Sequence, residues 1–97
     1  MQVEFRTRRL LRAYEHGDVA VRLWGADAAR WYANVITFMR SATGARDLFA
    51  YGHMRFHPLH GDKAGKHTAD LTNRWRLIVT LEGGTVTVEE VSRHYGD

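Results

Sequence analysis

The chain has 97 residues, of which 44% are hydrophobic and 11% are aromatic, and its formal charge is +3 at pH 7. One hydrophobic core fits this length and two do not, so we expect a single domain spanning residues 1–97, and the composition excludes a disordered polypeptide. The chain has no cysteine, which excludes disulfides, thiolate nucleophiles and thiolate metal ligands.

The N-terminal residues predict a protein of the cytoplasm. Several arginines stand within residues 6–12, where a signal peptide needs an apolar run. No stretch approaches the roughly 20 apolar residues that a membrane span requires. We therefore expect a soluble protein that is not exported and does not enter a membrane.

The first half of the chain has the residue spacing of helices. Residues 2–5 alternate and predict a short first strand. Apolar residues then follow helical spacing over 10–24, where we expect one helix with a kink near Gly17. A further helix is predicted from Asp27 to about Gly44, because apolar residues recur there at steps of three and four.

The middle of the chain predicts a connector followed by a strand. Residues 46–52 suit a connector that contains one helical turn, and 53–57 alternate polar and apolar residues. Met54 and Phe56 would then face the helices. The residues expected on the opposite face are His53, Arg55 and His57. Pro58 has no amide donor, so it should end this strand or lie at a sheet edge.

The second half of the chain predicts an antiparallel sheet. Residues 66–72 are expected to pair with the preceding strand, and 75–81 form the clearest strand, with Arg76 on its polar side. Glycines at 83 and 84 predict a hairpin turn into a return strand over 85–91. The expected fold class is α+β, with two N-terminal helices packed on one face of a curved, mainly antiparallel sheet.

The segment from residue 53 to 76 is locally basic and rich in titratable groups. Only Asp62 and Asp70 oppose its cations and histidines. The basic residues are Arg55, Lys63, Lys66, Arg74 and Arg76, and the histidines are His53, His57, His60 and His67. Such a segment is typical of a nucleic-acid contact, and an ordinary basic surface is the alternative.

Three blocks of the sequence resemble the HigB-like, killer-protein branch of the RelE/ParE superfamily of type II toxins. They are HPLHGDKAG at 57–65, NRWRLIV at 73–79 and EEVSRHYGD at 89–97, in the order found in that branch. The resemblance implies a RelE-like fold and a ribosome-dependent endoribonuclease that cleaves mRNA and inhibits translation. It also implies a helix-turn-helix antitoxin of the HigA type, through which the toxin–antitoxin complex binds operator DNA.

Metal-independent cleavage of RNA needs a base for the 2′-hydroxyl proton, a cation for the phosphate and an acid for the leaving oxygen. His57 matches the motif histidine and would serve as base or acid. Arg76 matches the strand arginine, whose planar guanidinium suits a phosphate. His94 matches the C-terminal histidine as its partner, and Tyr95 would stack on a base or bind a phosphate. A structural role is the alternative for each residue.

The remaining expectations concern binding and the departures from the branch. His60 stands where lysine is common, so it is a catalytic candidate whose charge depends on its surroundings, and Ser92 and Arg93 replace an acid and a tyrosine of some members. We expect RNA phosphates to be bound by Arg55, Lys63, Lys66 and Arg74. No metal or other cofactor is expected, because the histidines lie among cations that repel a dication.

Two other functions stay open at this point. ParE toxins of the same superfamily inhibit DNA gyrase by binding, without cleaving RNA, and the chain could act in that way. Alternatively, the departures at His60, Ser92 and Arg93 leave a catalytically weakened toxin that mainly binds its antitoxin.

Overall fold

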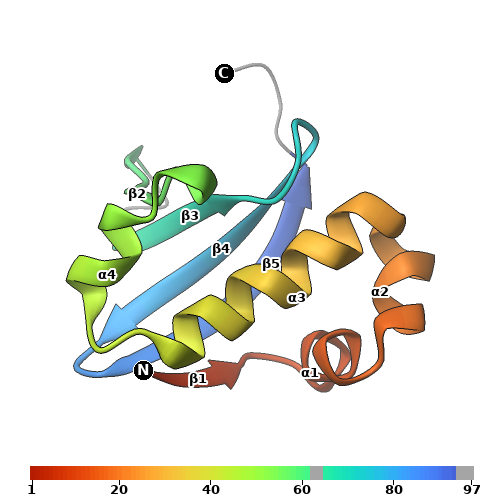
Figure 1. The fold of residues 1–97 in the computed structure, drawn as a ribbon, viewed down its shortest axis with the longest axis horizontal. Coiled ribbons are helices and arrows are strands. Elements are labelled where there is room, and N and C mark those ends of the chain that lie inside the picture. Colours follow the sequence, from red (N-terminus) through yellow and green to blue (C-terminus); the bar gives the residue numbers. More distant parts are fainter. Residues whose placement is uncertain (62–64, 94–97) are drawn as a thin grey trace.

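A computed structural model shows a five-stranded sheet with its helices on one face (Figure 1). The structure describes residues 1–61 and 65–93. In chain order the elements are β1 (Gln2–Phe5), α1 (Arg8–Glu15), α2 (Gly17–Trp24), α3 (Ala26–Ser41), α4 (Ala45–Ala50), a 3-10 helix (Gly52–Met54), β2 (His57–Pro58), β3 (Lys66–Asp70), β4 (Trp75–Glu82) and β5 (Thr85–Arg93). The predicted α+β class is confirmed, although there are more helices than expected.

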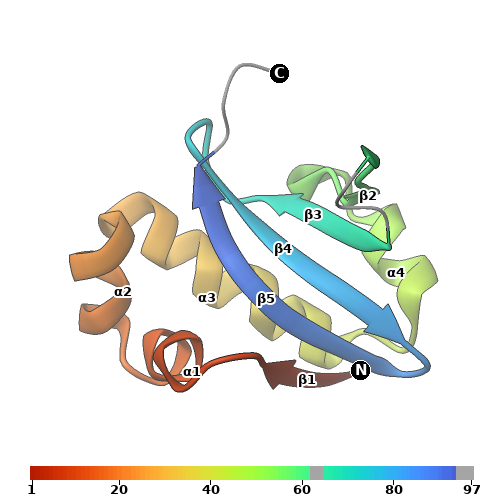
Figure 2. The same ribbon diagram turned by 180° about the vertical axis from the view of Figure 1, so that it is seen from behind.

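The sheet has the strand order β1-β5-β4-β3-β2. β1 runs parallel to β5, and the other neighbours are antiparallel, so the sheet is mixed but mainly antiparallel. The β4–β5 hairpin turns at Gly83, whose φ of 60° favours glycine. Figure 1 looks onto the helices, and Figure 2 looks onto the other face, where none of the described helices covers β3, β4 and β5. We call this side, on which no described helix packs, the open face.

The N-terminal helical region contains two helices where one kinked helix was predicted. α1 ends at Glu15, and the next residue, His16, has an extended backbone with φ −131° and ψ 100°. Gly17 then begins α2, and Gly25, with φ 88°, separates α2 from α3. The prediction was wrong because helical spacing on both sides of a break looks continuous when one extended residue lies between the helices.

The hydrophobic core lies between α3 and the sheet. Tyr32 and Ile36 of α3 are fully buried, and they pack in one cluster with Leu77, Val79 and Val88 of the sheet. The Tyr32 hydroxyl donates to the carbonyl of Leu10 at 2.7 Å and so joins α3 to α1. These contacts fix which face of each strand is covered, and therefore which side chains lie on the open face.

The predicted strand over residues 53–57 is absent. A 3-10 helix ends at Met54, Arg55 adopts a left-handed backbone with φ 47°, and only His57 and Pro58 pair with β3. Met54 and Phe56 are buried as expected. The ring of His53 packs on Trp31, with centroids 4.3 Å apart, so this histidine lies on the helix side of the sheet and its predicted face was wrong.

The physical reason is that this segment lies at the edge of the sheet. An edge segment loses few hydrogen bonds when it leaves the ladder, so burial of its two apolar side chains decides its course.

No helix in the described part of the chain is long and apolar enough to cross a membrane.

Candidate functional site

One row of side chains crosses the open face from β2 to β5. The strand register places His57 beside Thr68, Thr68 beside Ile78, and Ile78 beside Glu90. Paired residues of neighbouring strands project to the same side, so all four side chains share this face. His57 and Glu90 lie three strand spacings apart, which is roughly 14 Å between their Cα atoms. The row therefore carries an imidazole at one end and a carboxylate at the other.

A second row flanks the first and contains the candidate arginine. Asp70, Arg76 and Ser92 are neighbours in register on β3, β4 and β5. Arg76 is half-buried, and its Nε is buried without a hydrogen-bond partner among the described residues. A buried donor without a partner costs free energy, which a bound acceptor would recover. Arg76 thus has the surroundings of a group that binds an anion.

Two further cations border these rows. Lys66 lies two residues before Thr68 on β3, so it projects to the open face on the other side of the first row. Arg55 precedes β2, and its Nε lies 3.4 Å from Asp70 Oδ2. The structure therefore brings four of the predicted site residues to one face: His57, Arg55, Lys66 and Arg76.

The orientation of His57 is fixed by the backbone beside it. Its Nδ1 lies 2.7 Å from the carbonyl oxygen of Arg55. Because a carbonyl can only accept, Nδ1 carries the proton and donates it, which leaves Nε2 for proton exchange. The left-handed backbone of Arg55, with φ 47°, is an unusual conformation for a residue other than glycine, and it occurs directly at this contact.

His67 lies on the opposite side of β3 and has a different role. Its ring stacks on Phe56, with centroids 5.1 Å apart and planes 8° apart. Burial lowers the pKa of His67, and the nearby His57 lowers it further. His67 is therefore an uncharged aromatic group under the sheet and does not belong to the open-face cluster.

The other predicted site residues are not part of this cluster. His60 is exposed beyond β2, and Arg74 lies in the β3–β4 turn beside a different hollow. Lys63, His94 and Tyr95 lie outside the described residues. The structure adds Thr68, Asp70 and Glu90 to the face, none of which the sequence singled out. Within the described ranges, no three His, Asp or Glu side chains are placed to hold a metal ion.

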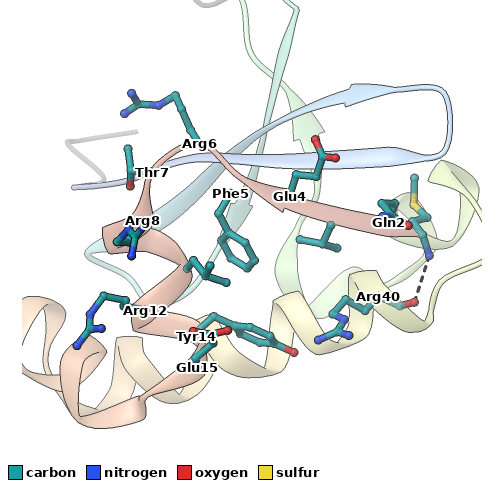
Figure 3. Close-up of a pocket in the computed structure, with 13 residues that line it drawn as sticks. Gln2, Glu4, Phe5, Arg6, Thr7, Arg8, Arg12, Tyr14, Glu15 and Arg40 are labelled. Carbon is teal, nitrogen blue, oxygen red and sulfur yellow. Dashed lines mark hydrogen bonds between the residues drawn. The ribbon is translucent and has the colours of Figure 1, made fainter.

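A large groove lies at the other edge of the sheet. It has a volume of about 1040 Å³ and runs between β1, α1 and the end of α3 (Figure 3). Phe5 and Tyr14 stack at its centre with ring centroids 5.7 Å apart, and the Arg40 guanidinium lies 5.9 Å from the Tyr14 ring. The charged residues that line it are Arg6, Arg8, Arg12, Arg40, Glu4 and Glu15. This groove is basic, and β1 is an edge strand.

Comparisons with known proteins place the fold among bacterial toxins. No protein-family model matches the chain, and no curated protein matches its sequence. Among solved structures, a YoeB/ParE toxin from Agrobacterium tumefaciens matches with a TM-score of 0.67 and 22% identity, over 98% of this chain and 100% of that one. YafQ from E. coli matches with a TM-score of 0.69 and 16% identity, over 98% of both chains.

A third match includes a partner protein. The YoeB–YefM complex from Staphylococcus aureus matches with a TM-score of 0.64 and 12% identity, over 98% of each chain. Matches of this extent, at such low identity, show a shared fold. The chain has the small α+β fold of the YoeB, ParE and YafQ toxins.

Proposed function

We propose that this protein is the toxin of a type II toxin–antitoxin pair, of the HigB-like branch of the RelE/ParE superfamily, and that it cleaves mRNA on the ribosome in the cytoplasm. The observation that supports this most directly is the open-face cluster: His57 and Glu90 at the two ends of one row, with Arg76 and Lys66 on either side. These are the groups that metal-independent cleavage of a phosphodiester requires.

The proposed reaction is an attack within the RNA strand. The Glu90 carboxylate takes the proton of a ribose 2′-hydroxyl, and the 2′-oxygen forms a bond to the adjacent phosphorus. The bond from phosphorus to the 5′-oxygen breaks, and protonated His57 gives a proton from Nε2 to that oxygen. Arg76 binds the phosphate oxygens while charge accumulates on them. The product ends in a 2′,3′-cyclic phosphate, and His94 is a second candidate for Glu90's role.

The test is cleavage of a defined mRNA on translating ribosomes. Purified protein should cut the mRNA at discrete positions that primer extension maps, and His57→Ala should stop both cleavage and the growth arrest caused by expression. His16→Ala, at an exposed histidine between α1 and α2, is the matched control and should remain toxic. A His57→Ala variant that stays folded and fully toxic would overturn the assignment.

The same preparation tests the two other functions. The Agrobacterium match is a YoeB/ParE toxin, so inhibition of gyrase is the first of them. A gyrase inhibitor of the ParE type would block supercoiling and leave mRNA intact. A weakened toxin would bind its antitoxin and leave growth unchanged. Intact mRNA together with inhibited gyrase would decide against the endoribonuclease.

We also propose that an antitoxin of the helix-turn-helix type binds in the β1 groove, and that the complex binds operator DNA through the antitoxin. β1 has a strand neighbour on one side, β5, so its other edge offers backbone groups to an added strand. The arginines of the groove favour an acidic segment. Loss of complex formation on reversing charges in this groove would support the placement.

A further inference from the structure

A second hollow lies at the start of β4, where the β3–β4 turn meets the junction of α2 and α3. It has a volume of about 370 Å³. Two tryptophans, Trp24 and Trp75, line it from opposite parts of the chain, together with the polar turn residues Asn73 and Arg74. None of the reactions proposed above uses this hollow.

Both indoles are held in place by their surroundings. The Thr72 hydroxyl accepts from the backbone amides of Arg74 and Trp75 at 3.1 and 3.2 Å, and the Trp75 carbonyl accepts from Leu71 at 2.9 Å. These bonds close the turn that carries Trp75. Trp24 packs on the buried ring of Tyr32, with centroids 4.8 Å apart. Pre-placed aromatic rings bind a flat ligand with little loss of conformational entropy.

The charges around the hollow favour an anionic ligand. Arg74 is exposed in its lining, and the Arg93 guanidinium lies 5.3 Å from the centroid of the Trp75 ring. The carboxylate of Asp27, which also lines the hollow, is paired with Arg30 at 3.5 Å. Aromatic rings beside cations are the groups that bind the bases and phosphates of single-stranded nucleic acids.

The hollow lies next to the open-face cluster along the chain but on the other side of the sheet. Trp75 directly precedes Arg76 on β4, and their partners on β5 are Arg93 and Ser92. Because successive strand residues project to opposite faces, Trp75 lies on the helix side and Arg76 on the open face. A ligand in the hollow is therefore separated from the open-face cluster by the end of β4.

We propose that this hollow binds one nucleobase of single-stranded RNA, stacked on the indole of Trp75, with the adjoining phosphates at Arg74 and Arg93. The inference rests on the proposed function in taking RNA as the substrate, and it adds a base-binding site separate from the groups proposed to cleave the RNA. Its volume lies at the small end of the roughly 300–1,000 Å³ range of ligand pockets, which suits a single nucleotide.

Tryptophan fluorescence gives a direct test. Trp31→Phe removes the tryptophan that packs on His53, outside the hollow, and leaves Trp24 and Trp75 as reporters. A single-stranded hexanucleotide with 2′-methoxy groups cannot be cleaved, and it should quench this variant. Hexanucleotides that lack one base at a time should show one position at which affinity falls by roughly 5- to 150-fold, the range expected for one stacked base.

Loss of the indole should remove that dependence. In the Trp31→Phe background, Trp75→Leu should weaken binding of the intact hexanucleotide to a similar degree, and removal of the critical base should then have no further effect. Ala26→Leu, at an exposed residue that lines the hollow, should do the same by filling it. The second variant keeps the test valid if Trp75→Leu does not fold.

Two results would overturn the inference: quenching that is insensitive to every missing base, or full affinity of both variants. The mRNA cleavage assay is read separately. If the protein cleaves mRNA but its binding depends on no single base, only this inference is wrong. If it binds the base but does not cleave mRNA, only the proposed endoribonuclease activity is wrong.

Discussion

The open face and the β1 edge of the sheet carry polar groups in different ways. On the open face, polar groups of β3 and β4 are withdrawn from water: Arg76 Nε and Thr68 Oγ1 are buried and have no hydrogen-bond partner within the described ranges. At the β1 edge the charges are solvated, as for Arg6, whose side chain is 57% exposed and whose Nε lies 3.6 Å from Glu89 Oε1. A desolvated donor without a partner costs free energy that a bound ligand would recover, whereas a solvated donor is already hydrogen-bonded to water. We infer that the open face suits a small anionic group and the β1 edge a broad, salt-sensitive protein contact.

The largest effect is expected at the desolvated arginine. Arg76→Ala should slow mRNA cleavage by about 10²–10³-fold, as does the loss of one donor that stabilises a transition state. Arg76→Lys keeps the charge without the planar fork and should recover part of the rate. Arg22→Ala, at an exposed arginine paired with Asp18 on α2, is the matched control. Cleavage by Arg76→Ala at the wild-type rate would remove the distinction between the open face and the β1 edge.

In the groove beside β1, charge reversal should weaken antitoxin binding and not mRNA cleavage. Arg8→Glu combined with Arg12→Glu should weaken antitoxin binding by roughly tenfold or more, mainly through slower association at low salt, and leave mRNA cleavage unchanged. Arg22→Glu with Arg46→Glu makes the same change of net charge elsewhere. Equal losses from both pairs in a binding assay would show that net charge alone matters.

A smaller effect, on stability, is expected at Thr68. Its hydroxyl is buried without a hydrogen-bond partner among the described residues, and Thr68→Val removes that group at nearly constant shape. We expect the free energy of unfolding to rise by about 1 kcal/mol, measured by urea denaturation. A less stable Thr68→Val variant would show that the hydroxyl is bonded in the free protein.

The smallest effect concerns pH. Burial lowers the pKa of His67 in the folded state, so the unfolded chain binds a proton more readily. The stability from His67 is therefore complete above the unfolded pKa of about 6.5 and is lost as the pH falls below it. His67→Phe keeps an aromatic ring against Phe56 and should flatten the decline of unfolding free energy between about pH 7 and 5. An unchanged slope in His67→Phe would contradict the assignment.

Residue periodicity predicted the elements whose structure depends on near neighbours. The α3 helix follows from its apolar spacing, and the β4–β5 hairpin follows from the glycine at 83. The open-face position of His57 was also predicted, and the register with Thr68 confirms it. However, His57 does not reach this face through the strand alternation that predicted it. A 3-10 helix and the left-handed Arg55 lie where a strand over residues 53–57 was expected.

The position of Glu90 shows what periodicity could not predict. Val86 and Val88 lie in the core, so alternation along β5 would place Glu90 with them. A register shift between Ile78 and Val79 of β4 instead puts Glu90 opposite Ile78 on the open face. One inserted residue in a strand reverses the face of all the residues that follow it.

The sequence by itself determined the α+β fold class, the helical first half and the β-rich second half, because these depend on composition and local spacing. Only the tertiary structure decided the parallel pairing of β1 with β5, the break between α1 and α2, and the row that joins His57 to Glu90. These depend on contacts between distant segments, whose register is set by packing across the core and by a bulge that local spacing does not reveal.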